Sequence, residues 1–364
     1  MLSIHYSTCL RKLADHLLKK LDENPSENLL APEIFVVQNH GIGQWLSLYM
    51  AREQGIAANL EFEFPSERIW SLIRLMDPNI PQTLPSDRGP LTWGLLRMLQ
   101  DEEVLQKFEK LRHYIGNENP IGQDIRCWQL CTKIADVFDQ YLVYRPGMLL
   151  DWEKGRRLYP QNEAEEWQYD LWRMLVAQWE KEYDGDWLHR AQLQGELLKA
   201  IENDTLDHDM LPDRVTVFGV SAMPPDFIRI LVKLSGLIDI NFYHLTIDPD
   251  VSDPEAFTNP MVKSLGKQGT TFTAALNRYI RENPGISCSV ERITSENLVT
   301  QEASLFNRLK LDLQQDRAPQ KTGTIKGDSS IQVHACHSPR REVEVLYNQL
   351  LAVLDENSSI MPDD

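Results

Sequence analysis

Two acidic side chains stand three positions apart in the segment ADVFDQYLVYRP, residues 135–146. On a helix, Asp136 and Asp139 would share one face, because residues three apart are neighbours there. Paired carboxylates can hold magnesium for nuclease chemistry, but no third acid and catalytic lysine accompany this pair. A carboxylate can also accept a hydrogen bond from the amino group of cytosine. A solvated helix face is the third interpretation, and the residues alone leave all three open.

Two arginines are expected at helix ends. Pro146 disfavours helical geometry in the residue before it, so Arg145 should lie at the end of the helix that carries both aspartates. There its guanidinium could bond the last carbonyl groups of the helix or reach a phosphate. Arg190, in WLHRAQL, should begin another helix, where it could serve a structural role.

A third set of polar side chains follows the apolar run Ile34–Val37, which predicts a buried strand. In an open α/β sheet, ligands bind at the carboxyl ends of the strands. We therefore expect part of a binding site here. The side chains able to hydrogen-bond base edges are Gln38, His40 and Gln44, and those able to stack on bases are Trp45 and Trp70.

The elements that must position these residues alternate between strand and helix at both ends of the chain. This alternation predicts a parallel sheet. Between them, a Pro-rich boundary at residues 77–90 precedes a stretch of almost wholly helical periodicity. The predicted α/β core domain is thus discontinuous and comprises residues 1–90 and 205–330. The predicted helical domain, residues 91–204, is an insertion, and residues 331–364 should begin a following α/β domain with a strand at 331–335.

Smaller elements follow from the same patterns. Residues 56–60 should extend after the second helix, and residues 298–313 should be helical. Polar residues with repeated Asp and Pro predict a surface loop at 246–270, and a mixture of Gly, Lys and Asp predicts a linker at 316–330. The tryptophans between 167 and 187 are interpreted as core. Cys127 and Cys131 lie one helical turn apart without a second pair at zinc spacing, so neither a zinc site nor a disulfide framework is expected.

The totals exclude several classes of protein. The 364 residues carry a net charge of −17, which argues against strong nonspecific duplex binding by this chain alone, because such binding is mostly phosphate neutralisation. No signal peptide or apolar run of about 20 residues is present, so we expect a soluble, cytoplasmic protein. The turn after the first strand, HYSTCLRKL, lacks the GxxxxGK[ST] residues that cradle phosphates, so ATP hydrolysis by this segment is not expected.

Several long blocks, in the same order, resemble the RecC family, the gamma subunit of exodeoxyribonuclease V (the RecBCD helicase–nuclease). They are VVQNHGIGQWLSLYMAREQGIAANLEFEFPSERIW, LRHY, ADVFDQYLVYRP, VTVFGVSAMPP and HACHSPRREVEVL. The resemblance covers the whole chain and matches least at residues 246–330. Family members are much longer, so the chain resembles their amino-terminal part.

The resemblance implies a superfamily-one helicase-like (RecA-like) parallel-sheet domain that lacks a functional P-loop and carries an inserted helical domain. It implies a non-catalytic scaffold and DNA-recognition subunit in a bacterial, cytoplasmic heterotrimer with RecB-like and RecD-like partners. Such a subunit binds single-stranded and forked DNA, channels the 3′-ended strand and recognises Chi during double-strand-break repair by homologous recombination. ATP and magnesium would be used by the partners, so no cofactor is expected in this chain, and no membrane association.

The family's Chi-contact residues carry over to matching positions. Seven match in type: Gln38, Gln44, Trp70, Asp136, Asp139, Arg145 and Arg190. Three positions depart, with His40 in place of a threonine, Phe64 in place of a leucine and Val137 in place of a leucine. His40 is bulkier than threonine and can protonate, and Phe64 can stack more strongly than leucine. Two alternatives stay beside this interpretation: a metal-dependent nuclease using Asp136 and Asp139, and a pure protein–protein scaffold.

Overall fold

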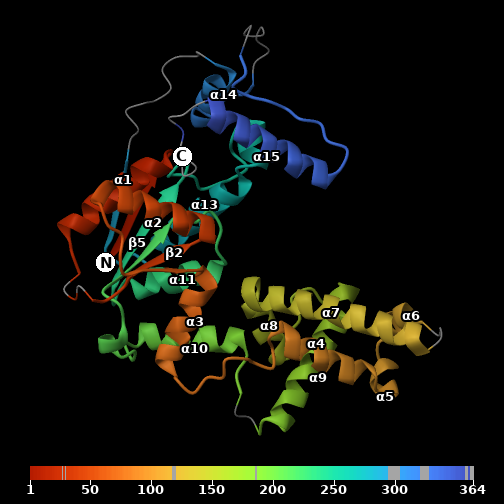
Figure 1. The fold of residues 1–364 in the computed structure, drawn as a ribbon. Coiled ribbons are helices and arrows are strands. Elements are labelled where there is room, and N and C mark those ends of the chain that lie inside the picture. Colours follow the sequence, from red (N-terminus) through yellow and green to blue (C-terminus); the bar gives the residue numbers. More distant parts are fainter. Residues whose placement is uncertain are drawn as a thin grey trace. The chain divides into compact units, whose positions relative to one another are not determined.

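The computed structural model (Figure 1) describes all residues except 27, 29, 117–119, 185–186, 294–303, 320–327, 357–359 and 361–364. The chain forms two compact units. An α/β unit comprises residues 1–65, 212–223 and 234–364, and a helical unit comprises residues 66–211 and 224–233. The helical unit thus takes in residues 66–90, which the sequence analysis grouped with the α/β core. The predicted domain division stays a prediction.

The α/β unit is built on a six-stranded sheet in the order β3-β2-β4-β5-β1-β6, with every pair parallel. The parallel sheet predicted from the strand–helix alternation is therefore confirmed. The strands are β1 (Leu2–Ser7), β2 (Glu33–Val37), β3 (Leu60–Glu63), β4 (Arg214–Phe218), β5 (Asp239–Leu245) and β6 (Cys288–Arg292).

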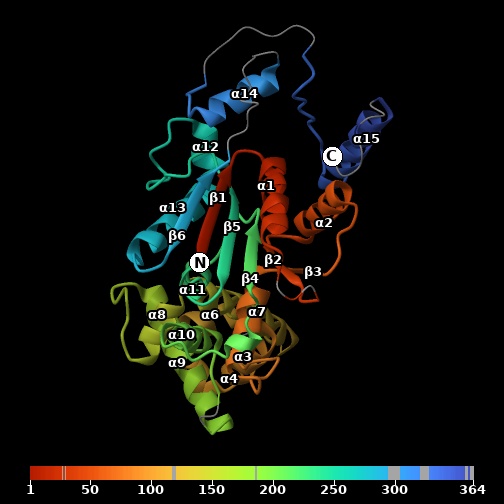
Figure 2. The same cartoon turned by 90° about the vertical axis from the view of Figure 1, so that its left-hand side faces the viewer.

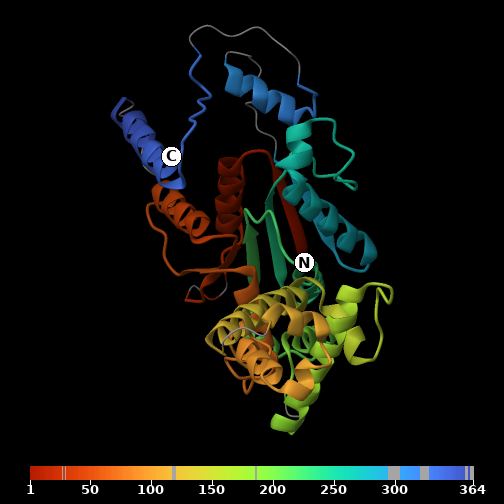
Figure 3. The ribbon, with the colours of Figure 1, turned by 90° about the vertical axis from the view of Figure 1, so that its right-hand side faces the viewer.

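Helices cover both faces of this sheet. On one face, α1 (Leu10–Glu23) and α2 (His40–Gln54) bury Leu13, Leu17 and Leu46 in a shared core with the strands. The other face receives α13 (Lys267–Glu282), where the Tyr6 hydroxyl donates to Asn277 Oδ1 over 3.1 Å. Figures 2 and 3 show α1 and α13 on opposite sides of the strands. Successive side chains of a strand point to opposite faces, which explains how β1 serves both layers. The remaining helices of this unit are α12 (Pro260–Ser264), α14 (Leu305–Gln314) and α15 (Pro339–Glu356).

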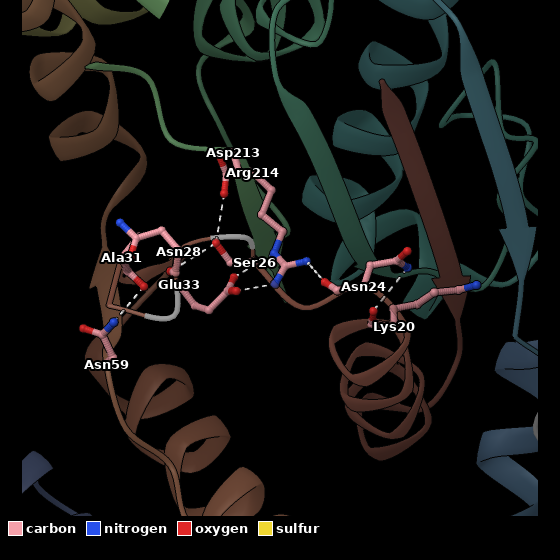
Figure 4. Close-up of polar contacts among 9 residues, drawn as sticks. All are labelled: Lys20, Asn24, Ser26, Asn28, Ala31, Glu33, Asn59, Asp213 and Arg214. Atoms are coloured by element: carbon pink, nitrogen blue, oxygen red, sulfur yellow. Dashed lines mark hydrogen bonds and ion pairs between the residues drawn. The ribbon is translucent and has the colours of Figure 1, made fainter. Parts of the chain in front are cut away.

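The amino-terminal ends of β2 and β4 are joined by an ion pair (Figure 4). Arg214 Nε donates to Glu33 Oε2 over 2.8 Å, and its Nη2 group pairs with Oε1 of the same carboxylate. The third arm of the guanidinium donates to the Asn24 carbonyl at the end of α1. Nearby, Asn59 Nδ2 donates to the Ala31 carbonyl over 2.7 Å. One arginine thus connects two strands and a helix at the edge of the sheet opposite to the expected ligand edge.

The helical unit packs around buried tryptophans. Trp172 and Trp179 are 0% and 4% exposed, and Trp167 and Trp187 are half-buried against the same core, so the interpretation of the tryptophans between 167 and 187 as core is confirmed. Trp152 is also buried, at 1% exposed. Trp93 and Trp128, by contrast, lie at the surface with ring centroids 4.9 Å apart. The helices are α3 (Pro65–Met76), α4 (Arg88–Leu99), α5 (Glu102–Leu105), α6 (Glu109–Ile115), α7 (Pro120–Tyr144), α8 (Pro146–Glu153), α9 (Glu163–Glu182), α10 (Arg190–Glu202) and α11 (Pro225–Leu234), with a 3₁₀ turn at His208–Met210.

Several predicted elements are wrong in place or type. The strand expected at 331–335 is irregular, and Val333 is 92% exposed; a strand needs a neighbour for its backbone hydrogen bonds, and no described strand pairs with this segment. Of the extension expected at 56–60, Leu60 is the first residue of β3, and residues 56–59 belong to no strand or helix. The predicted loop at 246–270 contains α12 and the start of α13. The helix expected at 298–313 is confirmed over its described part by α14, Leu305–Gln314. Residues 298–303 of that helix and residues 320–327 of the predicted linker lie outside the described part.

Two further expectations from the sequence concern the pairing of the cysteines and the presence of a membrane-spanning helix. All five cysteines are free, and Cys127 and Cys131 are buried in the core of the helical unit. Among the described residues, no helix combines the length and hydropathy required to cross a bilayer.

Candidate functional site

The carboxyl ends of β2 and β4 bring two polar side chains together. Gln38 directly follows β2, and its Oε1 accepts hydrogen bonds from the Ser221 backbone nitrogen over 3.0 Å and from the Ser221 hydroxyl over 2.8 Å. Ser221 follows β4, which is paired with β2. The backbone leaves β4 through Gly219, whose φ of +65° suits a residue without a Cβ. The two bonds fix the Gln38 carbonyl oxygen, so that its amide NH₂ group is oriented as a donor.

The start of α2 adds two more predicted residues at the same edge. Asn39 caps the helix by accepting from Ile42 N over 2.9 Å, which satisfies one of the unpaired amides of the first turn. His40 is the first helical residue and is exposed, and Gln44 follows one turn later, also exposed. Residues four apart lie on one helix face. His40 and Gln44 therefore present an imidazole and an amide side by side.

An aromatic side chain completes this group. Phe64 directly follows β3, which pairs with β2 in the register Val36↔Glu63. Its ring lies 4.6 Å from that of His40, centroid to centroid, at an angle of 56°. Trp45 does not belong to this group: it packs on Tyr49 (5.2 Å) and against the core of the unit. We define the carboxyl-edge group as Gln38, His40, Gln44 and Phe64.

The helical unit holds a second group, centred on Arg190. Its Nη1 donates to Asp139 Oδ1 over 3.3 Å and its Nη2 to Asp87 Oδ1 over 3.1 Å. The guanidinium carbon lies 5.8 Å from the centroid of the Trp70 ring, within cation–π distance. Trp70 also has the Arg74 guanidinium at 5.9 Å. These contacts bring together three predicted residues that are up to 120 positions apart in the printed sequence, about a third of the chain. We define the arginine-centred group as Trp70, Asp87, Asp139 and Arg190.

A buried network positions Arg190 at the start of α10. The preceding residue, His189, caps the helix through a reciprocal pair of bonds with Gln192. His189 Nε2 lies 2.7 Å from Glu153 Oε1, and the same oxygen accepts from Trp172 Nε1 over 3.1 Å. The ring of His189 is fully buried. Because α8, α9 and α10 are joined at this point, the first residue of α10 has little freedom to move.

Asp136 does not share the partners of Asp139. It pairs with Arg88 Nε over 2.6 Å, at the first residue of α4. Each aspartate thus has its own arginine partner. In the part of the chain that the structure describes, the one set of three His, Cys, Asp or Glu side chains close enough to share a metal ion contains neither aspartate. The geometry therefore gives the predicted nuclease alternative no third ligand.

Val137 and Arg145 complete the predicted set. Val137 is half-buried on α7, next to Asp136. Arg145 lies between α7 and α8 with φ −140° and ψ 44°, outside helical geometry, as expected from Pro146. Its backbone is engaged, with N donating to the Tyr141 carbonyl over 2.8 Å. Its side chain is exposed, so this guanidinium is accessible to a phosphate.

A pocket of about 840 Å³ lies past the carboxyl ends of β1 and β5, where a sheet of this type binds ligands. Its wall includes Thr8 and Cys9, in the turn that lacks the P-loop glycines and lysine. Charged side chains from α1, Arg11, Lys12 and Asp15, also line it. The conformation of the turn after β1 is fixed by two hydrogen bonds of the Ser7 hydroxyl, which donates to the Ile293 carbonyl and accepts from Cys9 N.

The sequence missed several residues that build these groups. Asp87 and Arg88 lie in the Pro-rich segment that predicts a domain boundary, although an acid just before a helix is also a recognisable start signal. Glu153 and Ser221 carried no signal, because their role depends on pairings across the fold. The ten predicted residues divide between the units: Gln38, His40, Gln44 and Phe64 belong to the α/β unit, and Trp70, Asp136, Val137, Asp139, Arg145 and Arg190 to the helical unit.

Comparison with known proteins identifies the family. The RecC N-terminal domain family matches residues 2–316 of the chain. The chain belongs to the RecC family. Relatives named RecBCD enzyme subunit RecC are 30% identical in Escherichia coli (strain K12), 28% in Haemophilus influenzae and 27% in Mycolicibacterium smegmatis. Each alignment covers 100% of this chain but only 36%, 38% and 32% of the relative, respectively, so this RecC-family chain spans about a third of their length.

Proposed function

We propose that this chain forms the amino-terminal part of a non-catalytic subunit that recognises the 3′-ended single strand in a RecBCD-like exodeoxyribonuclease V. In this proposal it scans that strand for Chi during double-strand-break repair by homologous recombination, and scaffolds RecB-like and RecD-like partners in the bacterial cytoplasm. The observation that carries the proposal is the pair of residue groups described above. Within a RecC-family chain, each places amide, carboxylate or guanidinium groups beside an aromatic ring.

The chemistry of both groups suits unpaired bases. Glutamine amides can bond adenine edges, carboxylates can accept from cytosine, and arginine can donate to guanine. Aromatic rings such as Phe64 and Trp70 contribute roughly 1–3 kcal/mol per stacked base in single-strand binding. Arg145 adds a cation for the phosphate backbone. Because most of these side chains hydrogen-bond rather than carry positive charge, the groups favour reading of sequence over nonspecific attraction.

Two features support a helicase-like fold without its own ATPase. The fully parallel sheet has β1 inside it and a pocket at its carboxyl end, where a nucleotide would bind in a motor domain. The turn after β1 lacks the lysine and glycines that hold phosphates. The net charge of −17 further supports a chain that depends on partners to hold DNA. ATP and magnesium are then used by the partners.

The experiment that tests this proposal uses full-length protein assembled with its RecB-like and RecD-like partners. A photo-crosslinking residue replaces Gln44, and the complex is given forked DNA labelled on one strand. Crosslinks to the 3′-ended strand are expected. Crosslinks only to the 5′-ended strand, or none, would contradict it. In a separate assay, ATP hydrolysis on DNA or magnesium-dependent cleavage by the isolated chain would overturn the non-catalytic assignment.

A further inference from the structure

Three side chains outside the proposed DNA groups converge on one face of the sheet. His5 on β1 is in register with Tyr243 on β5 on one side and Glu291 on β6 on the other. In-register side chains of neighbouring strands point to the same face. That face is covered by α1, which contributes His16, whose ring lies 4.7 Å from that of His5. Figure 2 shows β5, β1 and β6 side by side.

The ligand atoms are spaced as in a metal site. His16 Nε2 lies 3.2 Å from Glu291 Oε2, and His5 Nδ1 lies 3.5 Å from the same oxygen. All three atoms lie within 4.8 Å of one another. Nitrogen and oxygen ligands about 2.0 Å from zinc, at tetrahedral angles, are separated by roughly 3.3 Å. The carboxylate oxygen is therefore already at ligand spacing from both rings.

His5 Nδ1 and His16 Nε2 are buried, and neither makes a hydrogen bond of acceptable geometry with a described residue. The side chain of His5 is only 6% exposed, and that of His16 13%. His5 Nδ1 and His16 Nε2 both lie toward the same carboxylate oxygen of Glu291, so a single ion could be shared by the three side chains.

We propose that His5, His16 and Glu291 form a binding site for a divalent zinc-class ion. Two imidazoles and one carboxylate are an established protein ligand set for zinc, with water in the fourth position. The side chain of Glu291 is 51% exposed, so the fourth position faces solvent. Zinc is favoured over magnesium and calcium, because those ions require oxygen ligands.

The bound ion has a structural consequence. Among the described strands, β6 is the last of the sheet and pairs with β1. An ion held by Glu291 of β6 and His16 of α1 links this strand to the helix layer. Binding only to the folded state raises stability by mass action. A bound ion at this site would therefore stabilise the packing of β6 against α1.

The test is zinc binding by the purified 364-residue chain. After equilibration with zinc at a buffered free concentration and dialysis, elemental analysis is expected to find one ion per chain. Co²⁺ in the same site should give the visible absorption of a four-coordinate ion. Zinc should also slow amide exchange in β6. These readouts do not depend on DNA or on partner subunits.

His16→Gln and Glu291→Gln are each expected to weaken zinc binding more than about 10-fold. Even the loss of a residue that only supports a ligand can weaken metal binding by that much. Glu291 is half exposed and glutamine has the same shape as glutamate, so this variant should fold normally; circular dichroism checks the folding of both variants. The matched controls are His208→Gln, which removes an imidazole paired with Asp204, and the exposed Glu61→Gln. Controls should bind zinc normally. Absence of stoichiometric zinc in the unaltered chain, or unchanged affinity in both site variants, would overturn the proposal.

Discussion

Arg190 donates to Asp139 over 3.3 Å although the two residues lie 51 positions apart. Asp139 is on α7 and Arg190 is the first residue of α10, and the same guanidinium also bonds Asp87 before α4. One side chain therefore fixes the relative positions of three helices at the point where the predicted DNA-contact residues of this unit gather. This relationship gives the clearest mutational test of the helical unit.

Arg190→Lys should reduce Chi response in the assembled full-length complex at least about 10-fold. A lysine keeps the charge but has no planar fork able to bond both carboxylates, so Asp87 and Asp139 lose their common partner. The measurement is the fraction of DNA cut at Chi. Arg173→Lys is the matched control, because Arg173 also lies over an aromatic ring, 5.3 Å from Tyr169, on an exposed face. Equal effects of the two substitutions would count against the arginine-centred group.

Gln44→Ala should abolish most Chi response while leaving the melting temperature within about 1 °C. The side chain is exposed, and surface substitutions of this kind change stability by less than about 0.5 kcal/mol. Gln54→Ala, at the other end of α2, is the control. Ser221→Ala should have a weaker effect of the same kind, because it removes one of the two bonds that orient Gln38. A normal Chi response in Gln44→Ala would favour the pure scaffold alternative.

The free energy of unfolding should fall as pH drops from about 6.5 to about 4. Burial lowers the pKa of His5 and His244 to about 4 from an ordinary value of 6.5. In this window the unfolded chain takes up protons that the folded chain does not, so folding is penalised; above pH 7 neither state is protonated and the penalty is absent. For His244 alone the loss is about 3 kcal/mol, since one pH unit corresponds to about 1.4 kcal/mol.

Denaturant unfolding of His244→Gln at pH 7.5 and pH 4.5 checks this expectation. The variant should be less stable than the unaltered chain at pH 7.5, because His244 bonds the Val220 carbonyl and Thr273. It should nevertheless lose less stability on acidification. The exposed control His208→Gln should keep the full pH dependence. An identical pH dependence in His244→Gln would contradict the assignment of the slope to this residue.

The ion pair between Arg214 and Glu33 should contribute about 1–3 kcal/mol of coupling energy, as expected of charged hydrogen bonds in a bidentate pair. Both side chains are mostly buried, with 15% and 21% exposed. A double-mutant cycle with Arg214→Met and Glu33→Gln measures the coupling. The exposed pair Arg340–Glu344 on α15 is the control and should give less than about 1 kcal/mol. Equal coupling energies in the two pairs would contradict the claim that burial strengthens the Arg214–Glu33 ion pair.

The sequence was most informative where side chains have a strong period or an apolar run. Buried strands such as Ile34–Val37 and the core tryptophans of α9 could be predicted, because burial selects their type directly. β6 could not, because CSVER is a half-polar edge strand whose structure depends on pairing with β1. Residues 331–335 failed for the converse reason: their apolar pattern suits a strand, but no described strand pairs with them.

For the candidate site, the residue types could be predicted and their partners could not. Arg145 lies at a helix boundary because of Pro146, which is a local effect. The pairing of Asp136 with Arg88 and of Asp139 with Arg190 depends on how three helices, α4, α7 and α10, pack together, which no spacing along the chain encodes. The same holds for His5, His16 and Glu291, since two of these residues meet only through the register of β1 with β6.

Cleavage mapping tests the central claim most directly. Full-length protein is assembled with its RecB-like and RecD-like partners and given linear duplex DNA with or without Chi. The proposal predicts that cleavage changes at Chi in the unaltered complex, and that Gln44→Ala and Arg190→Lys remove the change without reducing unwinding. A Chi-dependent pattern that persists in both variants would contradict it.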